Sequence, residues 1–325
     1  MRTQINGVDV SPNDNMYAYK AFMSHVLTTT KSANQNYFKH FEGWELDAPI
    51  AQYGAVVKAN NTGLAARITK FSSNTDVRLL VRITDAIWCQ EKALPPGFAI
   101  RVQFDRNPEA FTLMRDGDVP ADPELHVHEA IMHLKTAELM STISEQHKHM
   151  LDSADGISLD MKYGQARLIE VPAAMTTYNV VNVYTGTLPA YIVIGLVQAE
   201  HYNGTLDSNP LHFKNFHLDR IKIGVNGHTW HDYPVELDTN ASDYLRAYRV
   251  FRDQTGFLHP DGGGESIDVT PVLWASCLNL FPFQISPYAA KQDVLPEIGR
   301  IEVELHFRVA TPHVLNMVFL AQKNA

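Results

Sequence analysis

The sequence predicts an all-β protein built from two β-sandwich or jelly-roll units side by side, with short helices inserted. Apolar and β-branched residues alternate with a period of two over several short segments, and turn residues separate these segments. The second half of the chain also repeats the order of motifs found in the first half. Strand-like and helix-like segments do not alternate regularly, which disfavours a parallel α/β fold.

The repeat begins with an Asn-Gly turn in each half. Asn6-Gly7 follows a short apolar segment and precedes an aromatic stretch at residues 17–22, and Asn226-Gly227 is followed in the same way by residues 244–251. Asn-Gly between alternating segments is a strong signal for a β-hairpin, and aromatic residues three and four positions apart indicate a helix. We therefore expect each unit to contain a hairpin and a helix whose aromatic face packs against its own unit.

The first unit is predicted to span residues 1–152. We expect strands at residues 77–88, 99–104, 111–114 and 125–139, the last being either one strand that changes its buried face or two strands around a bulge. Residues 141–151 begin with hydroxyl side chains and then place apolar residues at helical spacing. This pattern predicts a helix that connects the two units.

The second unit is predicted to span residues 160–325, with a helix at residues 243–252. Its predicted strands lie at residues 166–171, 178–184, 191–197, 216–225, 267–280, 298–307 and 313–320. In this unit residues 166–225 precede the Asn-Gly turn, whereas the first unit has essentially no strand before its own turn. We therefore expect the first unit to lack its opening strands and to expose unpaired strand edges.

Composition excludes several classes of protein. With 325 residues, 45% hydrophobic and 19% charged, the chain can bury two cores, and its net charge of −9 argues against a protein that coats nucleic acid. The start lacks the apolar core of a secretory signal, and the longest apolar stretches are too short to span a bilayer. We expect a soluble, intracellular protein in which Cys89 and Cys277 are buried free thiols.

Histidines are the strongest candidates for reactive chemistry. His126 and His128 would share one face of a strand, which provides half of a metal site. His147 with His149 and His228 with His231 offer weaker pairs, and the first pair is disfavoured because i and i+2 do not converge on a helix. Polar residues on a solvated face or at a subunit interface are the simpler explanation for all of these histidines. The sequence places no third ligand at metal-site spacing, so the metal candidates are His126 and His128 alone.

No catalytic or cofactor-binding constellation is evident in the sequence. Residues 261–265, Asp-Gly-Gly-Gly-Glu, lack the Lys-Ser/Thr that follows a phosphate-binding loop, and Gly-x-Ser-x-Gly is absent. Of the four tryptophans, Trp230 beside the second Asn-Gly turn is the plausible exposed platform for a ligand such as a glycan. We expect a protein that is not an enzyme and needs no cofactor.

Several motifs, taken in order, resemble one family. They are residues 188–197 (Leu-Pro-Ala-Tyr-Ile-Val-Ile-Gly-Leu-Val), 202–205 (Tyr-Asn-Gly-Thr), 209–216 and 218–227 in the second half, and residues 5–7, 17–22 and 94–97 in the first. The chain resembles the double-jelly-roll major capsid proteins of the Polinton/Maverick-like, adintovirus-related group, including copies integrated in invertebrate genomes. The resemblance covers nearly the whole chain, although the N-terminal strands of the family are not found here.

The resemblance implies a structural function. It implies a homotrimer that forms a pseudo-hexameric capsomer and tiles an icosahedral shell, with minor capsid and vertex proteins as further partners. It also implies a virion component that assembles in the cytoplasm or nucleus, with no direct sequence-specific binding of nucleic acid. The alternative is a non-enzymatic β-sandwich module that recognises a glycan or a protein, such as the product of a domesticated viral gene. Trp230 and residues 262–264 would then form its site.

Overall fold

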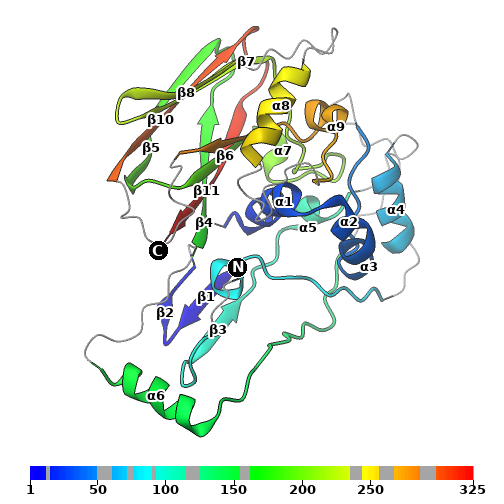
Figure 1. The fold of residues 1–325 in the computed structure, drawn as a ribbon. Coiled ribbons are helices and arrows are strands. Elements are labelled where there is room, and N and C mark those ends of the chain that lie inside the picture. Colours follow the sequence, from blue (N-terminus) through cyan, green and yellow to red (C-terminus); the bar gives the residue numbers. More distant parts are fainter. Residues whose placement is uncertain are drawn as a thin grey trace.

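The computed structural model describes residues 1–11, 15–49, 61–71, 76–89, 93–114, 124–153, 162–234, 244–255, 267–285 and 298–324. Two four-stranded sheets face each other, and a three-stranded sheet and the helices lie beside them (Figure 1). This architecture confirms the predicted all-β sandwich class.

Residues 162–324 form the sandwich. Its strands are β4 (Lys162–Val171), β5 (Thr177–Thr187), β6 (Tyr191–Gln198), β7 (Leu218–Val225), β8 (His228–Pro234), β9 (Leu280–Gln284), β10 (Ile298–Phe307) and β11 (Leu315–Asn324). The strand orders are β4-β11-β6-β9 in one sheet and β5-β10-β7-β8 in the other, with antiparallel pairing throughout. Because the chain crosses between sheets at every step except the β7–β8 hairpin, this is the topology of an eight-stranded jelly roll.

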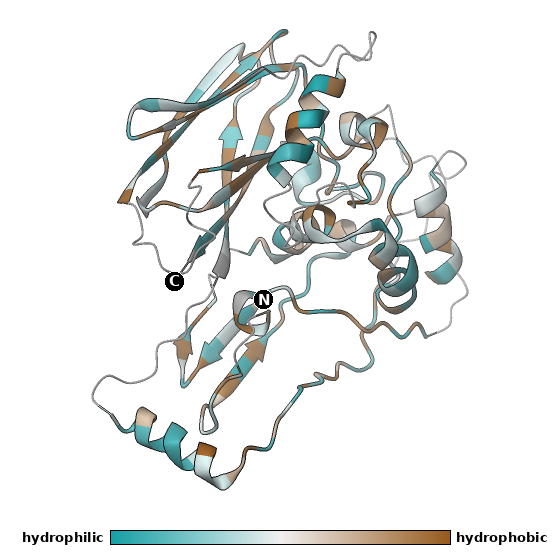
Figure 2. Ribbon diagram, in the orientation of Figure 1, coloured by the Kyte–Doolittle hydropathy of each residue, from teal (hydrophilic) through white to brown (hydrophobic). Residues whose placement is uncertain are grey.

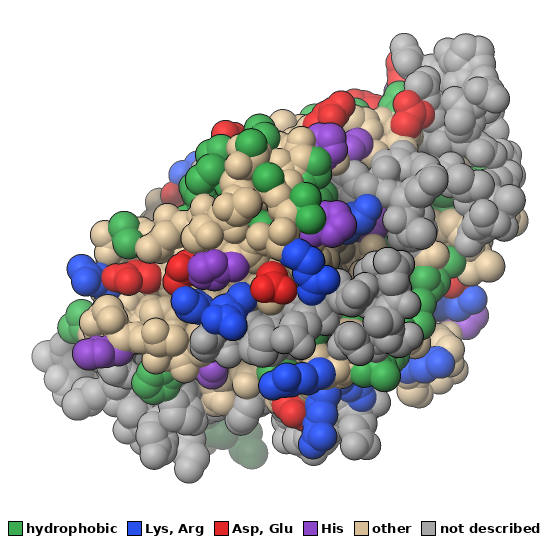
Figure 3. Space-filling view, turned by 90° about the horizontal axis from the view of Figure 1, so that it is seen from above, with side chains coloured by type: hydrophobic (Ala, Val, Ile, Leu, Met, Phe, Trp, Pro, Cys, Tyr) green, Lys and Arg blue, Asp and Glu red, His purple; other side chains and the backbone are tan. Residues whose placement is uncertain are grey.

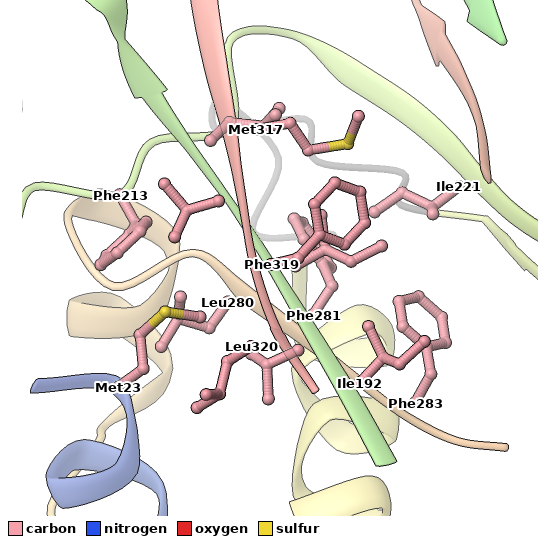
Figure 4. Close-up of a cluster of buried hydrophobic side chains, with 14 of the residues drawn as sticks. Met23, Ile192, Phe213, Ile221, Leu280, Phe281, Phe283, Met317, Phe319 and Leu320 are labelled. Carbon is pink, nitrogen blue, oxygen red and sulfur yellow. The ribbon is translucent and has the colours of Figure 1, made fainter. Parts of the chain in front are cut away.

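Burial patterns explain why these segments form strands. In β7 the buried residues alternate with partly exposed ones, which is the pattern of a strand with one face on the core. In β6 every residue is buried, because one face lines the core between the sheets and the other is covered by inserted helices. Figure 4 shows the cluster between these layers, where Phe319 and Met317 of β11 lie near Ile221 of β7.

The three-stranded sheet comes from the first unit. It consists of β1 (Arg2–Ile5), β2 (Val8–Asp9) and β3 (Ile100–Gln103), in the order β2-β1-β3. The sandwich contains the same arrangement in β8-β7-β10, where a hairpin pairs through its first strand with a strand that follows much later in the chain. The repeat that is visible in the sequence is therefore also a repeat of strand pairing.

The two Asn-Gly turns agree in atomic detail. Asn6 and Asn226 have φ values of 50° and 54°, and the glycine after each has a φ of 81°. The backbone N–H of Asn6 donates to the Ala99 carbonyl at 2.9 Å, and that of Asn226 donates to the Arg300 carbonyl at 3.0 Å. The Asn6 and Asn226 side-chain oxygens accept hydrogen bonds from the Ala99 and Arg300 amides, both at 2.9 Å. Each asparagine thus connects its hairpin to the neighbouring strand.

Substitution of Asn226 tests the role of this side chain. We expect Asn226→Ala to lower the free energy of unfolding by about 2 kcal/mol, since it removes one hydrogen bond and places an alanine in the left-handed region. Asn226→Gly removes the hydrogen bond alone and should cost about 1 kcal/mol. Urea unfolding followed by circular dichroism provides the measurement. Equal stability of Asn226→Ala and the parent chain would contradict the role assigned to the bond.

The described residues also form helices, most of which lie on one side of the sandwich, whereas α6 lies apart from it (Figure 1). They are α1 (Tyr17–Thr28), α2 (Lys31–Ala33), the π-helix η1 (Asn34–Phe38), α3 (Lys39–Phe41), α4 (Thr62–Phe71), the 3₁₀ turn η3 (Ala86–Trp88), α5 (Glu109–Thr112), α6 (Ser141–Leu151), α7 (Ala199–Tyr202), α8 (Tyr244–Thr255) and α9 (Pro271–Ser276). The connector helix predicted at residues 141–151 is confirmed as α6, and α1 and α8 confirm the two predicted aromatic helices. The assignment of residues 1–152 and 160–325 to separate units stays a prediction.

Two predicted strands of the first unit are wrong because local backbone groups find other partners. Residues 76–84 form no ladder; the Leu80 amide instead donates to the Phe41 carbonyl at 2.9 Å, at the end of α3. Residues 109–112 form the helical turn α5 after Pro108, whose carbonyl accepts from the Phe111 amide at 3.0 Å. Residues 77–88 and 111–114 are therefore not strands. The first segment is bonded to the end of α3, and the second begins inside the helical turn α5.

Two further strand predictions are also wrong. Residues 125–139 are extended but pair with no strand of the described residues. The predicted strand at residues 267–280 is interrupted by α9, since the Thr270 hydroxyl caps the Leu273 amide at 3.3 Å and Pro271 occupies the first turn. Only β9, which begins at Leu280, continues as a strand. Cys277 is buried as predicted, whereas Cys89 is exposed.

Candidate assembly surfaces

The most extensive contact between the two halves of the chain is made by α1. Met23 of this helix is fully buried, and Tyr19 is 3% exposed, against the sandwich. The Tyr19 hydroxyl donates to the Tyr202 and Pro210 carbonyls at 2.9 and 3.0 Å, and the Tyr19 ring stacks on Tyr202 with centroids 5.0 Å apart. The prediction that α1 packs against its own unit is therefore only half right: its aromatic face contacts Phe111 and Trp44 of the first half, and it also covers the sandwich of the second.

Helix α8 follows the prediction. Phe251 is 1% exposed and lies 5.7 Å from the ring of Trp274, which belongs to α9 of the same unit. The Tyr248 hydroxyl donates to the Val269 carbonyl at 2.6 Å, so this polar group is already hydrogen-bonded within the packing and needs no ligand. The two aromatic helices thus both pack on one sandwich, and both aromatic faces are used for packing.

Loss of the Tyr19 hydroxyl should weaken the contact between the halves. Tyr19→Phe keeps the stacked ring but removes both hydrogen bonds, so we expect the free energy of unfolding to fall by about 1–2 kcal/mol. Tyr37→Phe, at a side chain that is 47% exposed, is the matched control and should be neutral. Chemical unfolding monitored by tryptophan fluorescence measures both. An unaltered midpoint for Tyr19→Phe would show that these bonds do not hold the halves together.

A buried polar cluster lies where the inserted segments of the two halves meet. His25 Nε2 is 2.8 Å from Asn34 Oδ1, and Asn34 Nδ2 donates to Asp268 Oδ2 at 3.4 Å. The His25 ring also lies 3.9 Å from the Trp44 ring, centroid to centroid. Burial lowers the pKa of His25 and raises that of Asp268. Sequence reasoning missed this cluster, because no local pattern relates Asn34 to a residue 234 positions away.

Buried histidines should make the protein less stable in mild acid. Burial lowers the pKa of His25, and also that of His212, whose Nε2 lies 3.0 Å from the Ser276 carbonyl. A group with a lowered folded pKa binds more protons in the unfolded state, so stability falls as the pH drops below about 6.5 towards the folded pKa. The raised pKa of Asp268 has the opposite effect, because the folded state then binds this proton more tightly and stability rises as the pH falls through the folded pKa of Asp268.

The expected result is a lower thermal midpoint at pH 5.5 than at pH 7.5. A double variant, His25→Gln with His212→Gln, should be less stable at pH 7.5 but should lose less stability on acidification. The exposed His128→Gln is the control and should keep the parent slope. A pH-independent midpoint between 5.5 and 7.5 for the parent chain would contradict this assignment.

The structure does not bring His126 and His128 together as a metal site. His126 Nε2 pairs with Glu124 Oε2 at 3.2 Å, whereas His128 Nε2 faces Asp76 Oδ1 at 3.5 Å, and all four side chains are largely exposed. No group of three or more His, Cys, Asp or Glu suitable for a metal ion occurs among the described residues. His147 and His149 lie on α6, as predicted for a pair that cannot converge.

Trp230 is exposed, as the sequence indicates. It is the extra residue of a β-bulge in β8, because His231 pairs with Ile223 and Thr229 pairs with Gly224. The Trp230 indole, 49% exposed, donates to the Gln284 carbonyl at 3.4 Å, and His231 Nε2 lies 2.8 Å from the same oxygen. Residues 262–264, which were predicted to accompany Trp230, lie outside the described residues.

One open side of the sandwich forms a groove. Here β4, the edge strand of one sheet, lies beside β5, the edge strand of the other sheet. A cavity of about 450 Å³ at this place is lined by residues 166–169, residues 180–183, Met16 and Tyr202. Leu168 and Val181 on these strands are 40% and 58% exposed. Unpaired strand edges with apolar side chains are surfaces on which other protein chains can bind.

A second apolar surface is the extended segment that leads to α6. Val127 and Ile131 are each 65% exposed, and Met140 at its end is 73% exposed. Figure 2 shows the apolar residues of this segment along the lower part of the molecule, away from the sandwich. Sequence reasoning identified the alternation in residues 125–139 but assigned it to a paired strand. In the described structure the same alternation exposes its apolar side chains.

Charges on the described surface are mixed rather than gathered by sign. Figure 3 shows Lys, Arg, Asp, Glu and His side chains interspersed on one face. Ion pairs between neighbouring strands contribute to this pattern, such as Lys222 with Glu304 at 3.3 Å. None of the described helices combines the length and the apolar composition needed to cross a membrane.

No protein-family model matches the chain. Over 131 residues it is 26% identical to an uncharacterised protein of Caenorhabditis elegans, a match that covers 40% of this chain and 31% of that protein. The chain therefore spans about a third of this relative's length.

Among solved structures, the chain is similar to VP54 of PBCV-1 fitted into a reconstruction of the virophage Sputnik, with a TM-score of 0.30 and 11% identity. It is also similar to the quasi-atomic model of the PBCV-1 virus capsid, with a TM-score of 0.27 and 11% identity. Both alignments cover 51% of this chain and 48% of the other. The strand order and the duplicated hairpin described above remain the observations that define the fold.

Proposed function

We propose that the chain is a structural capsid subunit whose function is to assemble with copies of itself. The observation that carries this proposal is the duplicated hairpin geometry of Asn6 and Asn226, which relates a first unit to a complete jelly roll in the same chain. Two related units give one chain approximate two-fold symmetry. Three such chains around an axis then place six similar units around it. A homotrimer of this kind has a pseudo-hexagonal outline and can tile a closed shell.

The surfaces of the chain support self-assembly. The groove between β4 and β5 and the exposed apolar segment at residues 125–139 provide contact area on different sides of the molecule. Contacts of this kind are individually modest, and a closed lattice becomes stable through their number. The contact between α1 and the sandwich fixes the inserted segments from which further contacts between subunits can be made.

The chemistry of the described residues favours a non-enzymatic function. Burial lowers the pKa of His25, His201 and His212, and these rings are held within the packing by the Asn34 amide, by the Ser208 hydroxyl and by the Ser276 carbonyl, respectively. The exposed His126 and His128 each pair with a separate carboxylate. A negative net charge is also compatible with a shell built through protein contacts, while other, basic partners compact the genome.

Finer features of the proposal follow from the sequence resemblance. They are membership of the Polinton/Maverick-like group, an icosahedral virion as the location, assembly in the cytoplasm or nucleus, and minor capsid and vertex proteins as partners. No cofactor is required for this function.

Light scattering of the purified protein, with negative-stain images of the same peak, tests the proposal. A stable trimer with a roughly hexagonal outline is the expected result. A monodisperse monomer across the micromolar range would contradict self-assembly of this chain.

Trp230 supports a second candidate, a β-sandwich module that binds a glycan or a protein. Its exposed indole lies at a bulge, where a strand edge presents side chains to a ligand. A glycan array probed with the parent chain and with Trp230→Ala distinguishes the candidates. Binding that is lost in the variant would favour the module, whereas no binding by either protein would leave the capsid subunit as the proposal.

A further inference from the structure

Two positively charged side chains lie against one tyrosine ring on the open side of the sandwich. Tyr184 of β5 is fully buried, and its ring meets that of Phe319 of β11 edge to face, with centroids 6.4 Å apart. The guanidinium carbon of Arg167, in β4, lies 4.6 Å from the centroid of the Tyr184 ring, and Lys323 Nζ, in β11, lies 5.3 Å from it. Strands of both sheets thus bring two positive charges to one place.

Neither charge has a counter-ion among the described residues. Lys323 is only 7% exposed, yet its ammonium group makes no hydrogen bond or ion pair with the part of the chain that the structure describes, and burial together with repulsion from Arg167 lowers the pKa of Lys323. Arg167 donates to the Val183 carbonyl, which is neutral. Buried charges in folded proteins are normally paired, and an aromatic ring attracts a cation without neutralising it. The two cations therefore lack the negative charge that their burial requires.

The groove between β4 and β5 gives access to this pair. Arg167 and Val183 both line its cavity of about 450 Å³, and none of the described residues that line the cavity is acidic. The guanidinium of an arginine carries five N–H donors in a fixed fork that matches the oxygens of a carboxylate or a phosphate, and an ammonium adds three more donors. A cavity bordered by such donors and by no carboxylate of the described chain is suited to a negatively charged group.

We propose that Arg167 and Lys323 form a binding site for an oxyanion, a carboxylate or phosphate group, that enters through the groove between β4 and β5. Arg167 donates to its oxygens with the N–H groups that Val183 does not use, Lys323 supplies the second positive charge, and the Tyr184 ring holds both side chains in place. The proposal goes beyond the proposed function and does not depend on it. The oxyanion is either a free ion such as inorganic phosphate or a carboxylate of a second copy, and the experiment distinguishes these sources.

Thermal unfolding at low protein concentration, in increasing inorganic phosphate and at an ionic strength held constant with sodium chloride, is the first arm of the test. The midpoint of the parent chain should rise with phosphate, because a ligand that binds only the folded state stabilises it. Lys323→Met keeps an apolar stem but removes the charge, so the rise should disappear. Without phosphate this variant should be at least as stable as the parent, because it removes an uncompensated buried charge. Lower stability of Lys323→Met under these conditions would indicate an ion pair within the chain and would overturn the proposal.

Two further variants separate the site from general effects of salt. Lys222→Met removes an ammonium that already pairs with Glu304 at 3.3 Å, so it should keep the full phosphate response of the parent. Arg167→Gln should weaken phosphate binding by about tenfold or more in isothermal titration calorimetry, because it removes charge-assisted hydrogen bonds. Equal phosphate responses of the parent, Lys323→Met and Arg167→Gln would contradict the site, and so would a parent midpoint that does not respond to phosphate.

Protein concentration identifies the source of the oxyanion. In phosphate-free buffer, a midpoint that rises with the concentration of the parent but not with that of Lys323→Met would assign the oxyanion to a carboxylate of a second copy. A midpoint independent of concentration, with the phosphate response intact, would assign a free ion. These readouts are separate from the test of the proposed function: a trimer without the phosphate response contradicts this site alone, and a monomer with it contradicts the capsid subunit alone.

Discussion

Replacing Gly195 with alanine is expected to destabilise the sandwich by about 2–3 kcal/mol, and valine at this position should prevent folding to a soluble protein. Gly195 lies in the middle of β6, where every residue is buried. A Cβ atom there would lie 2.4 Å from Phe213 Cδ1 and 2.9 Å from Leu280 Cδ2. Figure 4 shows Phe213 and Leu280 within the packed cluster, so neither can withdraw without displacing its neighbours.

Gly224 is the matched control for this prediction. It also lies within a strand, β7, but a Cβ atom there would have its closest contact with Glu302 Cβ at 3.5 Å, an ordinary van der Waals distance. Gly224→Ala should therefore be neutral or slightly stabilising, since alanine loses less backbone entropy than glycine. Urea unfolding of the two alanine variants measures the difference. Similar midpoints would show that the layer between β6 and the inserted segments is loosely packed.

Strands whose neighbours are present were predictable from the sequence. Residues 298–307 were expected as a strand and form β10, with Ile301, Val303 and Leu305 fully buried at a spacing of two. The connector helix at residues 141–151 was likewise predicted with the bounds of α6. In both cases the local pattern and the final environment agree, so no information from distant residues was needed.

The wrong predictions arise where a local polar group or a residue far away in the sequence determines the conformation or the contacts of a segment. At residues 267–280 the alternation suggested a strand, but the Thr270 cap and Pro271 favour a helical turn. At residues 125–139 the alternation is that of a strand, and the described structure contains no neighbour to pair with it. Tyr19 contacts Tyr202 across 183 positions, and no periodicity within α1 indicates which sheet the helix will cover.

The histidine candidates illustrate the same limit at the level of a site. His126 and His128 were placed on one face of a strand, and that placement required the strand to exist. Without ladder partners their side chains reach two different carboxylates, Glu124 and Asp76. The exposure of Trp230, by contrast, was predictable because the Asn-Gly turn beside it fixes a hairpin end.

The second large effect is expected at Trp274. This residue is fully buried, and its ring lies within about 6 Å, centroid to centroid, of Tyr248, Phe251 and Phe281. Its indole N–H donates to the Leu280 carbonyl at 3.1 Å, at the start of β9. Trp274→Ala should lower the free energy of unfolding by about 3–5 kcal/mol, because it opens a large cavity between α8, α9 and the sheet.

The sequence counterpart, Trp88, gives the comparison that makes this result informative. Trp88 is half-buried, and its indole N–H reaches only the Thr3 hydroxyl, at 3.3 Å. Trp88→Ala should therefore cost about 1–2 kcal/mol, since less surface returns to water. Thermal unfolding by calorimetry measures both variants. Equal losses would mean that the first unit packs as closely around its tryptophan as the sandwich does.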